Sequence, residues 1–520
     1  MEHTNSFDVF DIIGPIMVGP SSSHTAGAVR IGLMAGQLCD YKPKAIKVLF
    51  YGSLASTYSF HKTDVAVVAG TMGIGVSDER IRDSVKIAEE NGIKVEFGIA
   101  KLEKAHPSTI IIVLKDEDGK EHIMRTATIG GGNIFIEEVN GYRVDLDGKQ
   151  NALVGITTIK DKAKFNKLIE DNIGKEFTIE AFNPVDENYS FKLISQNPID
   201  EDKVDKLKGF EEIKEAYNLK PIMAASVASK GFYGTVKELI EESKNNNCSI
   251  SETVLKFECE SSNRAEEEVL NEMKQNYLAM KEAIEKGVEK ESVMLANIFK
   301  GNANKMNQFI ESKKSICGVE LSKVTRNALA VMEINGSMGK IVACPTAGSA
   351  GTVPAAVITI AENNGISDDK AVKALFAGAG IGIIAAENAT ISGAVGGCQG
   401  ECGVASAMAA AIITEMFGGD YDSVDSAVSI ALGNILGLVC DPVAGTVELP
   451  CIQRNVMAAA NAIVSAEMAL AGVDSVIPAD EMIGALDEVG KLMHDSLKDT
   501  LGAGISNTPT ARKIEAELLG

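Results

Sequence analysis

The sequence predicts a multidomain protein in which an N-terminal α/β domain and a βαββα middle segment precede an all-α C-terminal domain. Three observations lead to this prediction. The 520 residues exceed what one hydrophobic core usually supports, so two or three domains are expected. Short apolar runs of strand type alternate with helical stretches up to about residue 220. Beyond that point long helical patterns dominate and few strand signals remain.

The N-terminal domain is expected to span residues 1–145. Its candidate strands are residues 45–51, 94–99, 109–114 and 124–129. A turn at Asp118 and Gly119 separates the last two strands, which therefore predict a hairpin. The glycine-rich residues 128–132 are typical of a chain reversal.

The middle segment, residues 146–220, is acidic and alternates strand and helix patterns. The predicted order is strand 152–156, helix 162–172, strand 176–182, strand 189–196 and helix 201–207. This order predicts a small βαββα domain.

The C-terminal domain, residues 221–520, begins with amphipathic helical patterns. In residues 264–290 the apolar side chains recur at spacings of three and four, as Leu270, Met273, Tyr277 and Met280. From Leu321 onward the helices are rich in glycine, alanine and serine, which permits close helix packing. We expect a compact helical domain whose glycine-rich loops line a site.

Charge and composition exclude several classes of partner. The formal net charge of -22 gives no positive surface for nucleic acid or anionic lipid, so neither is an expected partner. The start MEHTNSFDVF has no basic region and no apolar region of a secretory signal, so a cytoplasmic protein is expected.

Nine cysteines are present, an odd number that cannot pair completely within one chain. In a reducing compartment disulfides are not expected, which leaves metal binding, catalysis or inert burial. Five cysteines fall in loops flanked by glycine or proline, namely Cys344, Cys398, Cys402, Cys440 and Cys451. No CxxC pair exists, and loop position alone favours buried, inert cysteine.

Two polar segments of the N-terminal domain are candidates for chemistry. Residues 19–25 form a polar loop before a predicted helix at residues 26–38, where hydroxyl and N–H groups suit a carboxylate; a capped loop is the plainer interpretation. His61 and Asp64 are three residues apart, so the carboxylate could tune the imidazole as an acid or base. A surface His–Asp pair is the plainer interpretation there.

Together these segments resemble the iron-sulfur L-serine dehydratase family. Residues 19–25, 61–64 and 128–132 resemble its first domain, and residues 335–351, 388–403 and 437–455 resemble its catalytic domain. The domain order resembles the single-chain form of the family. The middle segment resembles an ACT regulatory domain in topology, although residues 158–162 lack the usual Asp-x-x-Gly.

The resemblance implies a [4Fe-4S] cluster on three cysteines, which correspond to Cys398, Cys440 and Cys451. Cys344 and Cys402 stand where the family usually has alanine and valine or isoleucine, so they are not expected to be ligands. Lys62 and Ala444 stand where the family commonly has glycine, which makes the local loop geometry a point of interest.

The resemblance also implies a reaction. An iron without a protein ligand would act as a Lewis acid toward the hydroxyl and carboxylate of L-serine, and the products would be pyruvate and ammonia. His61, tuned by Asp64, and His24 are both candidates for the base that removes the Cα proton. The expected substrate-binding residues are hydroxyl-bearing: Ser21, Ser22, Ser23, Thr63, Thr346 and Ser349. The site is expected between the first and last domains, and the chain is expected to form a homo-oligomer, most simply a dimer.

Two alternatives stay open at this point. A pyridoxal-phosphate enzyme could perform the same net reaction, with Lys340 beside the glycine-rich residues 347–351 as its anchor. A non-catalytic amino-acid sensor could instead be built on the middle segment.

Overall fold

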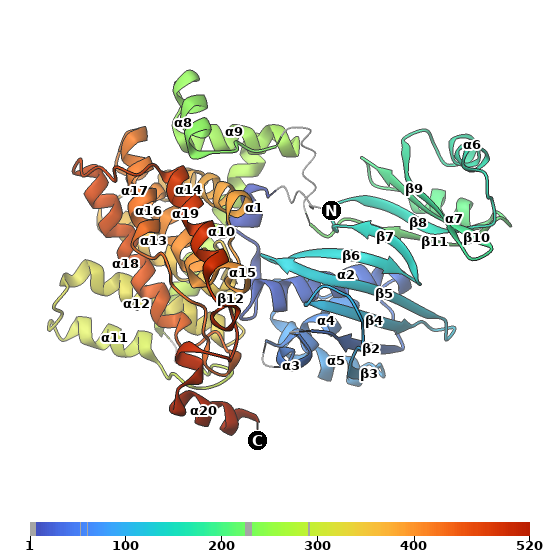
Figure 1. Ribbon diagram of the computed structural model, residues 1–520, viewed down its shortest axis with the longest axis horizontal. Coiled ribbons are helices and arrows are strands. Elements are labelled where there is room, and N and C mark those ends of the chain that lie inside the picture. The colour runs from blue at the N-terminus through green and yellow to red at the C-terminus, as the bar shows by residue number, and fades with distance from the viewer. Residues whose placement is uncertain (1–6, 53, 60, 224–230, 290–291, 520) are drawn as a thin grey trace. The chain divides into compact units, whose positions relative to one another are not determined.

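The computed structural model describes residues 7–52, 54–59, 61–223, 231–289 and 292–519 (Figure 1). Two compact units make up the chain. We call residues 23–225 the sheet unit, and residues 1–22 together with 226–520 the helical unit.

A six-stranded sheet and the helices that pack on it form the first part of the sheet unit (Figure 1). The strand order is β3-β2-β4-β5-β6-β7, with β2 and β3 parallel and the other neighbours antiparallel. The strands are β2 (Ala45–Phe50), β3 (Lys94–Ile99), β4 (Thr109–Lys115), β5 (Glu121–Gly130), β6 (Asn133–Val139) and β7 (Tyr142–Leu146). The predicted strands and the hairpin are confirmed. Strands β6 and β7 were not predicted, because glutamate, arginine and aspartate on their more exposed positions shorten the apolar runs.

Helices α2 (Gly27–Gly36) and α4 (Thr63–Thr71) pack closely, and each directly follows a predicted site segment. A Cβ atom on Gly32 would lie 2.2 Å from the carbonyl oxygen of Val67, and one on Gly70 would lie 2.1 Å from that of Val29. Only glycine permits this approach. The contact holds the middle of α2 against the C-terminal half of α4, so the helices that follow His24 and His61 pack against each other.

The second part of the sheet unit is a four-stranded antiparallel sheet with strand order β11-β8-β10-β9 and two helices. Its elements are β8 (Asn151–Thr157), α6 (Lys162–Asn172), β9 (Phe177–Val185), β10 (Asn188–Ser195), α7 (Glu201–Lys208) and β11 (Ile213–Leu219). Phe165, Phe191 and Leu193 are buried in its core. The predicted βαββα order is confirmed and gains a strand, β11. Charged and polar residues interrupt the apolar pattern of this edge strand, which is why the sequence did not reveal it.

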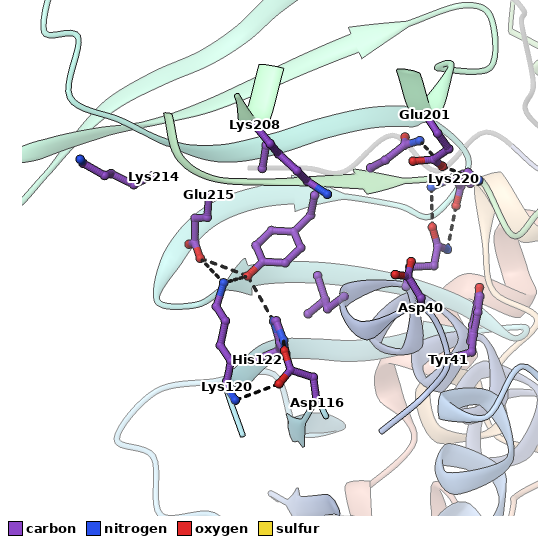
Figure 2. A pocket seen from close by; sticks show the side chains of 15 residues that line it. Asp40, Tyr41, Asp116, Lys120, His122, Glu201, Lys208, Lys214, Glu215 and Lys220 are labelled. Atoms are coloured by element: carbon purple, nitrogen blue, oxygen red, sulfur yellow. Dashed lines mark hydrogen bonds and ion pairs between the residues drawn. The ribbon is translucent and has the colours of Figure 1, made fainter. Parts of the chain in front are cut away.

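A cavity of about 430 Å³ lies within the sheet unit, where the two parts meet (Figure 2). At one end the backbone of Lys220 exchanges hydrogen bonds of 2.6 and 3.1 Å with the Gln37 amide. At the other end the Tyr217 hydroxyl lies 3.2 Å from His122 Nδ1 and donates to Glu215 at 3.1 Å. Burial and the Glu215 charge raise the pKa of Tyr217, so the hydroxyl keeps its proton and can donate. The cavity therefore has walls from both parts of the unit.

The helical unit packs long helices around a small-residue core (Figure 1). Its longer helices are α8 (Val236–Asn245), α9 (Ile250–Ser262), α10 (Glu266–Glu289), α11 (Asn302–Glu311), α12 (Gly318–Gly336), α13 (Thr352–Asn363), α14 (Asp368–Asn388), α16 (Val404–Met416), α17 (Tyr421–Gly433), α18 (Cys451–Leu470), α19 (Ala479–Leu492) and α20 (Pro509–Leu519). A Cβ atom on Gly382 of α14 would lie 2.3 Å from the Ile12 side chain, which confirms the close packing expected from the glycine content. Helix α14 is also long and apolar enough to cross a membrane, but most of it is buried within the unit.

The first 22 residues pack in the helical unit, although the sequence groups them with the N-terminal domain. Strand β1 (Ile16–Val18) pairs antiparallel with β12 (Lys340–Val342). The sequence predicted an all-α domain here, so this pairing departs from the prediction. The side-chain amide of Asn276 donates to the carbonyl oxygen of Ile13 at 2.7 Å. These contacts hold residues 19–22 against the residues that follow β12. The predicted polar loop at residues 19–25 is in part a π-helical turn, η1 (Ser22–Ala26).

Candidate active site

Three separate loops of the helical unit carry the predicted ligand cysteines. Cys398 follows the short helix α15 (Gly393–Gly396) and precedes the π-helical turn η5 (Gln399–Gly403). Cys440 lies in the loop after α17, and Cys451 is the first residue of α18. Cys398 and Cys440 are buried, whereas Cys451 is partly exposed. Glycine and proline next to these positions allow the sharp turns that bring the loops together.

The thiols influence one another electrostatically. Cys398 Sγ lies 3.5 Å from Cys402 Sγ, and this hydrogen bond, together with the nearby Arg454 guanidinium, lowers the pKa of Cys398. Burial raises the pKa of Cys440 and of Cys451; the Asp499 charge raises that of Cys440 further, and the Cys398 charge that of Cys451. Of the three predicted ligand thiols, Cys398 is thus the one already favoured as the thiolate that a metal requires.

Polar side chains support the loops around these cysteines. Arg454 donates to the carbonyl oxygen of Val439 at 2.7 Å and to the buried carboxylate of Asp441 at 2.8 Å. The other Asp441 oxygen accepts from the Ile505 amide. Asp499 Oδ1 lies 3.7 Å from Cys440 Sγ. The Cys440 loop is therefore fixed from both sides.

Thiols on three loops are donors of the kind that an iron-sulfur cluster uses. Among the described residues, no three His, Cys, Asp or Glu side chains converge as ligands of one ion. A four-iron cluster is larger than an ion and holds its thiolate ligands further apart, as loops from three places in the chain can do. Gly393 supplies space beside Cys440, because a Cβ atom there would lie 3.1 Å from Cys440 Sγ. Soft thiolate donors are the ligands of iron-sulfur clusters, and also of zinc and copper(I).

A set of hydroxyl groups lies in the same unit. The capping turn at Thr346 joins its hydroxyl to that of Ser349 at 3.2 Å. The Ala347 amide donates to the Ser22 hydroxyl at 2.7 Å, which brings the N-terminal polar loop to this turn. Ser22, Thr346 and Ser349, predicted from sequence to act together, are all buried here.

Glu401 completes this group of polar residues and was not predicted. Its Oε1 atom accepts a 2.8 Å hydrogen bond from the Thr346 hydroxyl. Burial raises the pKa of Glu401 to about 8, and the Cys398 charge contributes. The sequence signal was its position three residues after a candidate ligand. Arg454 and Asp441 also lie within one of the motifs recognised, whereas nothing in the sequence singled out Asp499.

The two candidate base residues lie together in the sheet unit. The His24 and His61 rings are stacked, with centroids 4.5 Å apart and planes inclined by 15°. The Thr25 hydroxyl donates to the His61 carbonyl oxygen at 3.1 Å. Burial, and then the neighbouring His61, lower the pKa of His24 well below its usual range. His24 is therefore neutral at neutral pH and able to accept a proton.

The residues after His61 start helix α4. Lys62 has a φ of 57°, the left-handed conformation that glycine adopts most easily, and Ala444 has a φ of 52°. Both positions at which the chain departs from the family's glycine therefore keep a glycine-like backbone. Asp64 Oδ1 accepts from the Val65 amide at 2.9 Å, so its pairing with His61 stays a prediction. Thr63 is buried, and its hydroxyl has no hydrogen-bond partner among the described residues.

Cys344 and the remaining two serines occupy other positions. The Cys344 thiol is fully buried, and burial raises its pKa. Its carbonyl oxygen accepts from Ser349 at 3.0 Å, a contact of the backbone and not of the thiol. Ser21 and Ser23 flank Ser22 and are partly exposed.

Two families match the chain, and together they cover most of it. The family described as "Serine dehydratase beta chain" matches residues 6–139, and the family described as "Serine dehydratase alpha chain" matches residues 245–506. Residues 140–244, which include the four-stranded sheet, lie between the two matches.

Similar proteins include separate chains and single chains. A probable L-serine dehydratase alpha chain of Bacillus subtilis is 42% identical over 55% of this chain and 96% of its own length. An L-serine dehydratase of Streptomyces coelicolor is 27% identical over 96% of this chain and 98% of its own length. L-serine dehydratase TdcG of Escherichia coli has the same identity and coverage. The chain belongs to the serine dehydratase family and carries its beta-chain and alpha-chain regions, in that order, on one polypeptide.

Proposed function

We propose that this chain is a lyase that converts L-serine to pyruvate and ammonia. The observation that carries the proposal lies in the helical unit. There Cys398 and Cys440 pack in one buried cluster, and Glu401, three residues after Cys398, accepts from the Thr346 hydroxyl in the turn that also binds Ser22. The relatives named L-serine dehydratase, which match nearly the whole chain, support the same reaction.

Cys398, Cys440 and Cys451 would hold a [4Fe-4S] cluster. When bound, such a cluster supplies a Lewis acid that makes the serine hydroxyl a better leaving group. Burial of Cys398 and Cys440 limits access of water to the site. The hydrogen bonds of Arg454 to Val439 and Asp441 keep the Cys440 loop in place.

The remaining chemistry belongs to side chains. Ser22, Thr346 and Ser349 would orient the substrate with their hydroxyl groups, and Ser21, Ser23 and Thr63 would assist. His61 or His24 would take the Cα proton. An imidazole must be neutral to act as this general base. Burial keeps His24 in that neutral form.

Anaerobic purification tests this proposal against the alternatives. Protein reconstituted with iron and sulfide should contain about four iron atoms per chain and release pyruvate from L-serine. Air should abolish both the broad visible absorption and the activity, and ferrous iron with a thiol should restore them. A discrete Schiff-base band would instead indicate pyridoxal phosphate at Lys340. Full activity in iron-free protein would exclude the cluster.

We also propose that the βαββαβ segment is an ACT-like regulatory domain. The cavity shared with the first part of the sheet unit supports this role (Figure 2). Asp40 and Lys208 line it, and neither forms an ion pair with another described residue. A small molecule that carries both charges would be complementary to these two side chains, and its binding would couple the two parts of the unit.

Equilibrium binding to cluster-free, full-length protein tests the regulatory role. With L-serine as the probe, we expect saturable binding that Asp40→Asn and Lys208→Gln each weaken by roughly tenfold, the effect of losing one charged hydrogen bond. Lys164→Gln, an exposed change on α6 of the same domain, is the matched control. Absence of binding, or binding that neither cavity variant alters, would exclude L-serine from this cavity.

A further inference from the structure

Glu401 lies deep in the helical unit, yet part of its surface remains accessible. It is held from two sides. The Thr346 hydroxyl donates to Oε1. The backbone of Glu401 belongs to the π-helical turn η5, which directly follows Cys398. The carboxylate therefore has one oxygen with a fixed partner, while for Oε2 no hydrogen bond is seen to any described residue.

Two glycines make the space that the carboxylate occupies. A Cβ atom on Gly348 would lie 3.0 Å from Oε1, and one on Gly393 would lie 2.5 Å from Oε2. The same Cβ atom on Gly393 would lie 3.1 Å from Cys440 Sγ. Oε2 and a predicted cluster ligand thus border the same small volume, and any side chain on Gly393 would fill it.

No lysine or arginine forms an ion pair with Glu401 among the described residues. The nearby Arg454 is engaged by Asp441 at 2.8 Å. A carboxylate in a buried site without a cation is costly, and such groups are usually paired. Of the three polar groups of L-serine, only the α-ammonium group is cationic, and a bound cluster would supply a Lewis acid for the other two.

We infer that Glu401 determines specificity for an amino acid by accepting a hydrogen bond from the substrate's α-ammonium group at Oε2. This inference rests on the proposed function. The arriving ammonium group supplies the ion-pair partner that Glu401 lacks, and so favours the ionised carboxylate. Thr346 then acts as a positioning residue, because its hydrogen bond to Oε1 turns the other oxygen toward the substrate.

The test compares two ligands that differ only in the amino group. L-serine has it, and 3-hydroxypropanoate keeps the carboxylate and the hydroxyl without it. Dissociation constants come from anaerobic titrations that follow the visible absorption of the cluster. For L-serine, the absorption is read immediately after mixing, before turnover consumes the ligand. Iron content is measured for each variant.

In the Glu401→Gln variant, we expect L-serine to bind roughly 10- to 100-fold more weakly, the loss of one hydrogen bond between charged groups. Binding of 3-hydroxypropanoate should stay the same or tighten, and KM for L-serine should rise more than kcat falls. Glu415→Gln, which changes a carboxylate on α16 that accepts from the Ser251 amide, is the matched control and should alter neither ligand.

Equal weakening of both ligands, or of neither, would overturn the inference. If the Glu401→Gln variant does not retain iron, Glu401→Asp takes its place. This variant keeps a carboxylate but shortens the side chain by one methylene, and it must weaken the binding of L-serine and not that of 3-hydroxypropanoate. Absence of iron or of serine turnover in the unmodified protein would defeat the proposed function itself, so the two failures are distinguishable.

Discussion

Replacing Cys398, Cys440 or Cys451 by alanine is expected to remove the cluster and the dehydratase activity together. Two protein thiolates should not retain a four-iron cluster, since three already leave one iron open. Each variant should lose its broad visible absorption and release no detectable pyruvate after anaerobic reconstitution. Iron and sulfide analyses on the same samples provide the measurement.

The remaining loop cysteines are the controls, and Cys402 is the demanding one. Its sulfur lies 3.5 Å from that of Cys398, although the resemblance does not make it a ligand. Cys344 is fully buried, and only its backbone takes part in the polar contacts of the site. Alanine at either position should leave about four iron atoms per chain and most of the activity.

Two results would reassign the ligands. If the Cys402→Ala variant lost the cluster while the Cys451→Ala variant retained it, Cys402 would be the third ligand. The short distance between the sulfurs of Cys398 and Cys402 would then reflect binding to the same cluster. If Cys344→Ala emptied it, the family's usual alanine at that position would have been a poor guide for this chain. Neither result would exclude the enzyme class.

The sequence predicted the elements whose apolar pattern is regular. Strand β3 was predicted to the residue, and β2 and β4 to within one residue, because their branched apolar runs are short and bounded by turns. Strand β11 was missed because its order IKEAYNL mixes charges into an edge strand. The pairing of β1 with β12 joins segments more than 300 residues apart, a contact that no local pattern reveals.

The site shows the same limit. Loop composition and family resemblance together named the cysteines and the hydroxyl residues, but not the carboxylate among them. Glu401 is visible only when Thr346 and Gly393 are placed around it in space. The histidine pair is similar, since the stack between His24 and His61 joins two segments that no local pattern brings together.

Substitution of His61 by alanine is expected to lower kcat by roughly a hundredfold or more, the usual contribution of a general acid or base. Because His24 stacks on His61, the matched variant is His24→Ala. His24→Ala removes the other imidazole from the pair while the cysteine loops keep their sequence. Iron content should stay unchanged in both variants, which separates proton transfer from cluster loss.

The pH profile of kcat/KM then identifies the base. Burial lowers the pKa of His24 well below 6.5, so its neutral form persists as the pH falls through 6.5 and is lost only at a lower pH. If His24 is the base, the acid limb of the unmodified protein lies well below pH 6.5. His61 contributes to that lowering, so His61→Ala should raise the pKa of His24 and move the residual acid limb upward. Unchanged kinetics in His61→Ala would remove His61 from the mechanism, and unchanged kinetics in both variants would remove the pair.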